Sequence, residues 1–478
     1  MRAYVILRYT GFVFLFNSLF LLMSAAISAG YNDSALFPLL YSAILSALFG
    51  VFPIIFVPPA SQITNKEGFS IVMLSWLLSC LVGSLPYMLW GGEFSLTNAW
   101  FESVSGYTTT GSTILTDIEA IPLGLLFWRS ATHWIGGIGI IIFVLAVLPS
   151  IGRTGMVLYR VEMSSLAVTN FNYNTKKTMQ ILLVVYVGLT ALETTALLFC
   201  DMSWFDAVTH SFATIATGGF SPKNLSIGHY QNIWVEGVII VFMIFSGIHF
   251  GILFISAISV PSRIWKSEIV RYYISALAIA VLITTFAVYK APFQNVGQAF
   301  RYAAFNVISL GTSTGFATTD TSTWPPLAVL IMLFFTLQCA CAGSTSGGIK
   351  VDRIVIFIKG IKLRLVKLQH PHSVIAAKID GMAIDQELLS ASVAYIPLYL
   401  GIVFVSSLLL TAMGVDALTA FSGSAATMGN VGPGFGEVGS VGNFSQIPMP
   451  GKWVLTITML LGRLEIFAVI LLFKLRNW

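Results

Sequence analysis

A short segment rich in threonine, serine and glycine recurs four times in this chain. Each copy follows a short amphipathic stretch and precedes a long apolar run. The copies read TTTGST, ATGGFS, TSTGFAT and GNVGPG, and we align them on Gly111, Gly218, Gly315 and Gly432. The gaps are 107, 97 and 117 residues, so one unit of about a hundred residues is repeated four times. Such a repeat constrains the fold, because every copy must adopt the same local structure.

The apolar runs are too long and too numerous for a water-soluble protein. Apolar side chains make up 56% of the 478 residues and charged side chains only 9%, whereas soluble domains carry about 25% charged residues. A helix needs roughly 20 apolar residues to cross a bilayer. We predict ten spans, at 4–29, 34–56, 69–90, 123–149, 178–200, 231–260, 269–290, 326–342, 388–413 and 452–473.

The basic residues predict the orientation of these spans. With the N-terminus in the cytoplasm, 19 of the 25 lysines and arginines fall in cytoplasmic segments or at the cytoplasmic ends of spans, four fall in outer segments or at the outer ends, and two lie deeper within spans. This asymmetry follows the positive-inside rule, so we expect both termini in the cytoplasm and the glycine segments outside. The first run has no small-residue cleavage pattern, so we interpret it as a retained helix. Nothing in the charge pattern indicates nucleic-acid binding.

A helix too short to cross the membrane precedes each glycine segment. The four are expected at Leu96–Tyr107, Trp204–Ala213, Val296–Leu310 and Ala417–Thr427. Re-entrant backbone of this kind is tolerated only where it is buried in protein or lines a water-filled cavity. We therefore predict an all-α polytopic membrane protein, with four pseudo-symmetric M1–P-loop–M2 units around one pore and two extra N-terminal helices. The expected divisions are 1–68 for the two-helix appendage and 69–177, 178–267, 268–385 and 386–478 for the four units with their linkers.

The glycine loops can supply the oxygen ring that a dehydrated potassium ion requires. Backbone carbonyls from four segments surround a cation if their peptide planes turn inward, and glycine permits the positive φ that this needs. One glycine per loop, against two in the TVGYG filter, predicts fewer tight sites and weaker discrimination against sodium. The expected potassium ligands are backbone carbonyls of Thr109, Thr110, Gly111, Ser112, Ala216, Thr217, Gly218, Gly219, Ser313, Thr314, Gly315, Phe316, Asn430, Val431, Gly432 and Pro433.

A run of small and polar residues, 341–348, interrupts the third unit's second span. Three hydroxyl residues and three glycines in eight positions do not form a stable helix in lipid. We interpret the break as a movable plug beneath the filter, with a packing kink as the alternative. The run also resembles a phosphate-binding loop. In such loops the lysine directly follows the second glycine, whereas here it follows Ile349, so we expect no nucleotide bound by this chain. The expected gate residues are Gly343, Ser344, Thr345, Ser346, Gly347, Gly348, Lys350 and Arg463.

Two arginines fall within predicted spans, where an isolated charge costs about 2.5–3.5 kcal/mol on insertion scales. For Arg463 two interpretations stay open: a guanidinium that limits cation occupancy below the filter, or an ion pair with a buried acid such as Glu193 or Glu102. Glu465 is a poor partner, because positions i and i+2 do not face one another on a helix. We expect Arg129 to extend its side chain to the outer interface.

The cytoplasmic stretch at 350–385 carries seven basic residues. One interpretation is positive-inside topology together with attraction to anionic lipid headgroups. The other is a docking surface for an acidic regulatory partner. The charge pattern alone favours the lipid interpretation.

Several motifs resemble a known family: SGYTTTGST, WRSATHWIGGIG, ATGGFSP, FNVISLGTSTGFATTD, AGSTSGGIKVDR, GNVGPG and LLGRLEIF. They are similar to the bacterial Trk-type potassium uptake proteins of the TrkH/Ktr/HKT superfamily, over essentially the whole chain. The resemblance implies a homodimer in the bacterial inner membrane, with one pore per protomer and a cytoplasmic TrkA-type nucleotide-binding ring. It also implies that 343–348 and Arg463 form the gate. Gly111 favours potassium, because serine there is associated with sodium transport in plant relatives.

We therefore expect gated, channel-like potassium uptake, with a potassium/proton or potassium/sodium symporter as the alternative. Coupling usually needs a titratable group near the bilayer midplane, for which Glu193 is the main candidate. Energetics do not require coupling, because 100 mV is worth about 2.3 kcal/mol per charge, or roughly fifty-fold accumulation. Enzyme activity is not expected, because no HExxH motif occurs and the polar loops lie at equivalent positions of the repeat.

Overall fold

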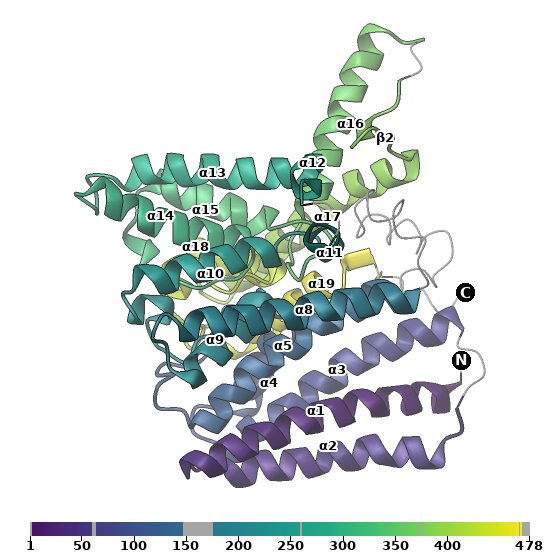
Figure 1. Cartoon of the computed structure of the whole chain (residues 1–478), viewed down its shortest axis with the longest axis vertical. Coiled ribbons are helices and arrows are strands. Elements are labelled where there is room, and N and C mark those ends of the chain that lie inside the picture. The colour runs from purple at the N-terminus through teal and green to yellow at the C-terminus, as the bar shows by residue number, and fades with distance from the viewer. Residues whose placement is uncertain are drawn as a thin grey trace.

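The computed structural model describes residues 2–59, 64–146, 175–258, 261–372, 375–467 and 469–470, and nearly all of its elements are helices (Figure 1). Two antiparallel helices, α1 (Ala3–Tyr31) and α2 (Leu36–Phe56), form a hairpin along one side of the molecule. Gly11 and Gly50 let their backbones approach, because a Cβ on either would lie 2.8 Å from the other's carbonyl oxygen. This hairpin is the predicted N-terminal appendage.

The rest of the described chain repeats one pattern four times: a long helix, a short helix, a loop and a second helix. The long helices are α3 (Asn65–Trp90), α8 (Thr175–Leu198), α13 (Glu268–Val288) and α17 (Gln386–Ala412). The short helices are α4 (Leu96–Tyr107), α9 (Trp204–Ile215), α14 (Val296–Gly311) and α18 (Ala417–Gly429). The second helices are α5 (Leu123–Ala146), α10 (Ile233–Ser246) with α11 (Phe250–Ile258), α15 (Pro326–Gln338) with α16 (Val351–Gln369), and α19 (Met449–Arg463).

The short helices begin at the predicted residues and end within two residues of the predicted ends. Each begins after a side chain that accepts a hydrogen bond from its first turn, which satisfies a backbone N–H that the helix leaves unpaired. These capping residues are Ser95, Ser203, Asn295 and Asp416. The same local chemistry therefore starts all four short helices.

Within the described residues, six helices are long and apolar enough to cross a membrane, or seven if α10 and α11 count as one bent span. The predicted spans at 231–260, 326–342 and 452–473 are not continuous helices. The first bends by 105° between α10 and α11, the second stops at Gln338, and the third breaks after Arg463. The backbone freed at these breaks is bonded inside the protein, as membrane depth requires. The amide of Cys341 donates to Gly247, and that of Phe250 donates to Gly343.

The smaller elements are α12 (Arg263–Lys266), the short 3₁₀ turns at Ser226–His229, Thr321–Thr323 and Gly436–Val438, and one two-stranded hairpin. In the hairpin, β1 (Lys378–Ile379) pairs antiparallel with β2 (Met382–Ala383). The predicted linker at 150–177 lies outside the described residues, apart from the first turn of α8, and so does 471–478. The predicted division into units remains a prediction.

Candidate ion-conducting site

The four polar loops meet in a closed ring. In each loop one glycine has a φ between 80° and 100°, a conformation that glycine adopts without strain. A Cβ on any of these four ring glycines would lie less than 3.0 Å from a carbonyl oxygen of the next loop, closer than real Cβ atoms come. The ring glycines Gly111, Gly219, Gly315 and Gly432 face, in that order, the carbonyls of Gly218, Thr314, Val431 and Thr110. Loop one therefore abuts loop two, and so on until loop four abuts loop one.

This geometry corrects the predicted alignment of the second unit. Two positions before every ring glycine, a residue with a side chain takes a left-handed φ of 52° to 58°; these residues are Thr109, Thr217, Ser313 and Asn430. The ring glycine of unit two is therefore Gly219 rather than Gly218, and Gly218 supplies a facing carbonyl. The equivalent stretches are Thr109–Ser112, Thr217–Phe220, Ser313–Phe316 and Asn430–Pro433.

The corrected alignment changes the assignment of two residues to the equivalent stretches. Ala216, predicted as a filter residue, caps the end of α9 and precedes the equivalent stretch. Phe220, which the sequence analysis missed, occupies the position of Ser112. The cause is the Gly218–Gly219 pair, which allows two alignments that differ by one residue, and only backbone φ distinguishes them.

Each loop is hydrogen-bonded to the last turn of its own short helix. The bonds run from Thr110 to Ser105, Gly218 to Ala213, Thr314 to Ser309 and Val431 to Ala426, with N···O distances of 2.8 to 2.9 Å. The C-terminal ends of all four short helices therefore lie next to the ring. Their partial negative charge favours a cation there.

A cavity of about 200 Å³ opens on one side of the ring, and all four ring glycines line it. Gly218 does not line it, which agrees with the corrected alignment. Arg129 also lies on the wall of this cavity. The ring glycines are therefore accessible from this cavity.

Arg129 is buried, with 3% of its surface exposed, and does not extend to the outer interface as the sequence predicted. Its Nε lies 2.6 Å from Oε1 of the fully buried Glu102 on α4, and it donates to the carbonyl of Ser221 in unit two. Its guanidinium stacks on Phe220, 3.5 Å from the ring centroid. A charge buried this deeply requires such a partner. The pair links the first unit to the segment that follows the second loop.

Other polar contacts join the remaining units around the ring. Between units two and three, Glu236 and Arg301 form an ion pair of 2.7 Å. Between units four and one, the hydroxyl of Ser112 donates to the carbonyl of Gly432 at 2.9 Å. Asn430 also donates to the hydroxyl of Thr110 at 3.0 Å. The loops are thus held by their neighbours as well as by their own helices.

The predicted gate residues lie directly against the ring. The gate loop, Gly343–Gly348, separates α15 from α16. The amide of Gly347 donates to the hydroxyl of Ser313 in loop three, and that hydroxyl lies 2.9 Å from the one on Ser346. The hydroxyl of Thr345 donates to the carbonyl of Ile215 at the end of α9. The structure therefore brings this loop against loop three of the ring and the end of α9.

Arg463 holds the gate loop from the fourth unit. It is 2% exposed and donates to the carbonyl of Thr345 at 2.6 Å. It also donates to the carbonyl of Gly136 on α5 at 3.1 Å. Glu102, one of the two acids expected to pair with it, is paired with Arg129 instead. The positive charge therefore sits on the gate loop and joins units one, three and four.

A buried ionic cluster lies where the gate loop joins α16, and the sequence analysis did not find it. Glu465 pairs with Arg353 at 2.9 Å and with Lys350 at 3.7 Å, while Arg353 stacks on Tyr395. Lys350 and Glu465 both have positive φ, 69° and 61°, at breaks in their helices. The only signal in the sequence is that these ionisable residues lie within the motifs AGSTSGGIKVDR and LLGRLEIF.

Comparisons with known proteins agree with this architecture. A family model described as "TrkH: Cation transport protein" matches residues 42–477. The chain is 33% identical to the Trk system potassium uptake protein TrkH of Halomonas elongata, over all of both chains. It is 37% identical to TrkH of Escherichia coli, over 87% of each. The crystal structure of the potassium transporter TrkH from Vibrio parahaemolyticus superposes with a TM-score of 0.90, at 32% identity and over the full length of both.

Proposed function

Because the chain belongs to the TrkH family of cation transport proteins, we propose that its ring of carbonyls is the selectivity filter of a gated potassium pore. The chain is a multi-pass membrane protein of Trk-type potassium uptake and not an enzyme. The observation that carries the finer proposal is the closed contact of each ring glycine with the next loop's carbonyl. Four such carbonyls from one chain can replace the hydration shell of a potassium ion.

Conduction in this proposal begins at the cavity beside the ring glycines. The ion loses water to the carbonyls of Thr110, Gly218, Thr314 and Val431, and the four helix ends compensate its charge. Below the ring it meets the gate loop and the guanidinium of Arg463, which repels a cation. Opening requires the loop to leave Ser313 and Ile215. The membrane potential drives the net uptake.

The test is rubidium-86 uptake into proteoliposomes loaded with potassium. Gly315→Ser places a Cβ against the carbonyl of Val431 and forces a serine to φ +82°. A left-handed residue with a side chain costs about 1–2 kcal/mol, and relief of the contact displaces the Val431 carbonyl from the ring, so the preference for potassium over sodium should fall. Gly237→Ser is the control, because a Cβ there meets nothing within 4 Å. Robust uptake with unchanged selectivity in Gly315→Ser refutes the filter assignment.

One observation favours proton or sodium coupling as a second candidate. Glu193 on α8 is fully buried and forms no ion pair within the described residues. A carboxyl group buried within a membrane-spanning helix is a candidate functional residue. If it carries a proton with potassium, Glu193→Gln abolishes the pH dependence of rubidium uptake. If the pore is uncoupled, the variant keeps the pH profile of the native chain.

The proposal includes partners that Trk-type uptake implies. We propose a homodimer in the bacterial inner membrane with cytoplasmic termini, surrounded by lipid, and a cytoplasmic TrkA-type nucleotide-binding ring that controls opening. The gate loop continues into α16, which projects from the bundle (Figure 1). A ring that binds and moves α16 would therefore also move the gate loop. Adding purified TrkA-type protein and nucleotide to the proteoliposomes should change uptake several-fold. Unchanged uptake would contradict the regulation of opening by such a ring.

A further inference from the structure

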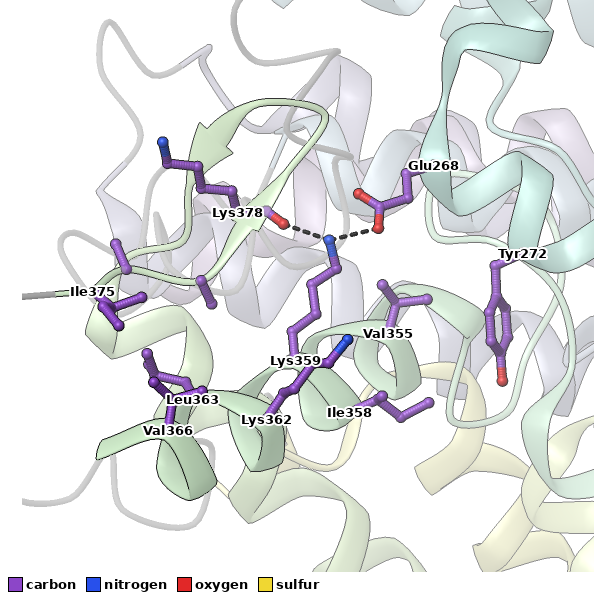
Figure 2. Close-up of a pocket in the computed structure, with 12 residues that line it drawn as sticks. Glu268, Tyr272, Val355, Ile358, Lys359, Lys362, Leu363, Val366, Ile375 and Lys378 are labelled. Carbon is purple, nitrogen blue, oxygen red and sulfur yellow. Dashed lines mark hydrogen bonds and ion pairs between the residues drawn. The ribbon is translucent and has the colours of Figure 1, made fainter. Parts of the chain in front are cut away.

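A second cavity, of about 480 Å³, lies away from the ion pathway, where α13 begins (Figure 2). Its walls are the first turn of α13, one face of α16 and residues 375–378. The residues from α16 recur at helical spacing, so a single stripe of that helix faces the cavity. The stripe consists of Val355, Ile358, Lys359, Lys362, Leu363 and Val366.

Hydrogen bonds and an ion pair fix the walls relative to one another. The Lys359 ammonium lies 2.6 Å from the Glu268 carboxylate and also donates to the carbonyl of Lys378, as Figure 2 shows. The amide of Glu268 donates to the Asp380 carboxylate at 2.7 Å, and the amide of Asp380 donates back to Glu268 at 3.4 Å. These contacts join α13, α16 and the β1–β2 hairpin, so the cavity exists without a ligand to shape it.

The lining combines apolar surface with positive charge. Ile358 and Ile375 are 47% and 44% exposed. Lys359 and Lys362 rise from the same side of α16. Glu268 neutralises Lys359, whereas Lys362 is exposed and makes no ion pair within the described residues. A ligand that fits must therefore carry an anionic group that binds Lys362 and a hydrocarbon part that packs against Ile358 and Ile375.

The cavity lies at the end of a candidate membrane span, where lipid headgroups are expected. Glu268 is the first residue of a membrane-spanning helix. Helix α16 runs across the direction of α13 and α8 rather than along it (Figure 1). Its far part exposes Leu365 and Leu368, 56% and 78%, among basic residues. An amphipathic basic helix of this kind lies in the membrane interface. We propose that the cavity binds one anionic phospholipid, with its phosphate on Lys362 and an acyl chain along Ile358 and Ile375.

A bound lipid would act on the same helix that begins at the gate. Asp352, in the first turn of α16, accepts a hydrogen bond from Ala342 beside the gate loop, at 2.6 Å. Val355, one turn further on, already lines the cavity. A lipid that holds α16 against α13 would therefore resist movement of the gate loop. This consequence rests on the proposed gating, whereas lipid binding itself does not.

The binding test uses the full-length chain in detergent, titrated with short-chain phosphatidylglycerol and followed by native mass spectrometry. We expect one bound lipid in the native chain and about five-fold weaker binding for Lys362→Gln, the effect of one lysine near an anionic surface. Lys362→Glu should weaken binding further. Lys367→Gln is the matched control, because Lys367 is exposed on α16 but does not line the cavity.

Several results would overturn the proposal. Equal binding of phosphatidylcholine would show that charge is irrelevant, and full competition by inorganic phosphate would show an ion site rather than a lipid site. An equal loss in Lys367→Gln would indicate diffuse attraction to the basic helix. A change of oligomeric state in Lys362→Glu without lipid binding would assign the surface to a second copy of the chain. Because none of these readouts requires transport, they leave the filter proposal intact.

Discussion

The filter loops and the gate loop are both irregular backbone buried among the spans, yet they are held in opposite ways. The filter is built four times from equivalent positions, and the backbone of each loop abuts the next. The gate loop belongs to unit three and is held mainly by hydrogen bonds that involve the side chains of Arg463, Thr345 and Ser313, together with one backbone bond from Phe250 to Gly343. A repeated backbone contact cannot change at one place without disturbing its neighbours, whereas a side-chain hydrogen bond can be broken alone.

This difference separates the two properties that an ion pathway needs. Selectivity depends on oxygens that stay in place, and in the proposed pore the closed ring supplies them. Opening depends on an element with two arrangements of similar free energy, and a loop held by a few replaceable bonds meets that requirement. We therefore expect substitutions behind the filter to cost folding stability, and substitutions around the gate loop to change opening with little effect on stability.

The largest expected effect is that of Arg129→Met. It leaves the Glu102 carboxylate buried without its cation, and breaking a buried pair in this way costs about 3–5 kcal/mol. The thermal midpoint of the detergent-solubilised protein should fall markedly, and potassium selectivity with it. Arg301→Met is the comparison, because Arg301 is 27% exposed and its loss should cost less. Equal midpoints for the native chain and Arg129→Met would refute the fixed filter.

Arg463→Gln should have the next largest effect, on opening. It removes a charged donor from the carbonyls of Thr345 and Gly136, and such hydrogen bonds are worth about 1.5–3 kcal/mol. Rubidium uptake should rise by about ten-fold or more, and the thermal midpoint should fall less than in Arg129→Met. Lys452→Gln, at the other end of α19, should leave uptake unchanged. A large loss of stability without added uptake would remove the distinction between gate and filter.

Ser313→Ala tests the point where the two regions touch and should have the smallest effect. It deletes the hydroxyl that accepts from Gly347, a neutral hydrogen bond worth about 0.5–1.5 kcal/mol, so uptake should rise two- to ten-fold. Ser309→Ala removes a bond to Phe316 within the same loop and should alter selectivity instead. If both variants changed only selectivity, the contact between gate and filter would have no part in closure.

The sequence predicts the parts of this molecule that depend on neighbouring residues. Apolar runs and glycine-rich loops are local signals, so the sequence predicts the ends of the short helices to within two residues. It also predicts a break at 341–348, because small and polar residues do not form a helix in lipid, although the helix ends earlier, at Gln338. The family resemblance was confirmed by the comparisons.

Features set by distant residues could not be predicted. Arg129 and Glu102 are 27 positions apart, and Arg353 and Glu465 are 112 apart. Nothing in their spacing shows that they meet. The alignment of unit two failed for a local reason, because Gly218 and Gly219 are chemically identical and differ only in backbone φ. Charged side chains within spans therefore predict that a partner exists without saying which residue it is.

Because one polypeptide supplies the whole ring, a single codon change alters one quarter of it. In a filter made from four identical subunits, the same mutation appears at all four positions at once. Here the places equivalent to Ser112 are already occupied by Phe220, Phe316 and Pro433. Each quarter can therefore change separately. A single mutation alters one of the four positions that surround the ion, whereas in a homotetramer it alters all four.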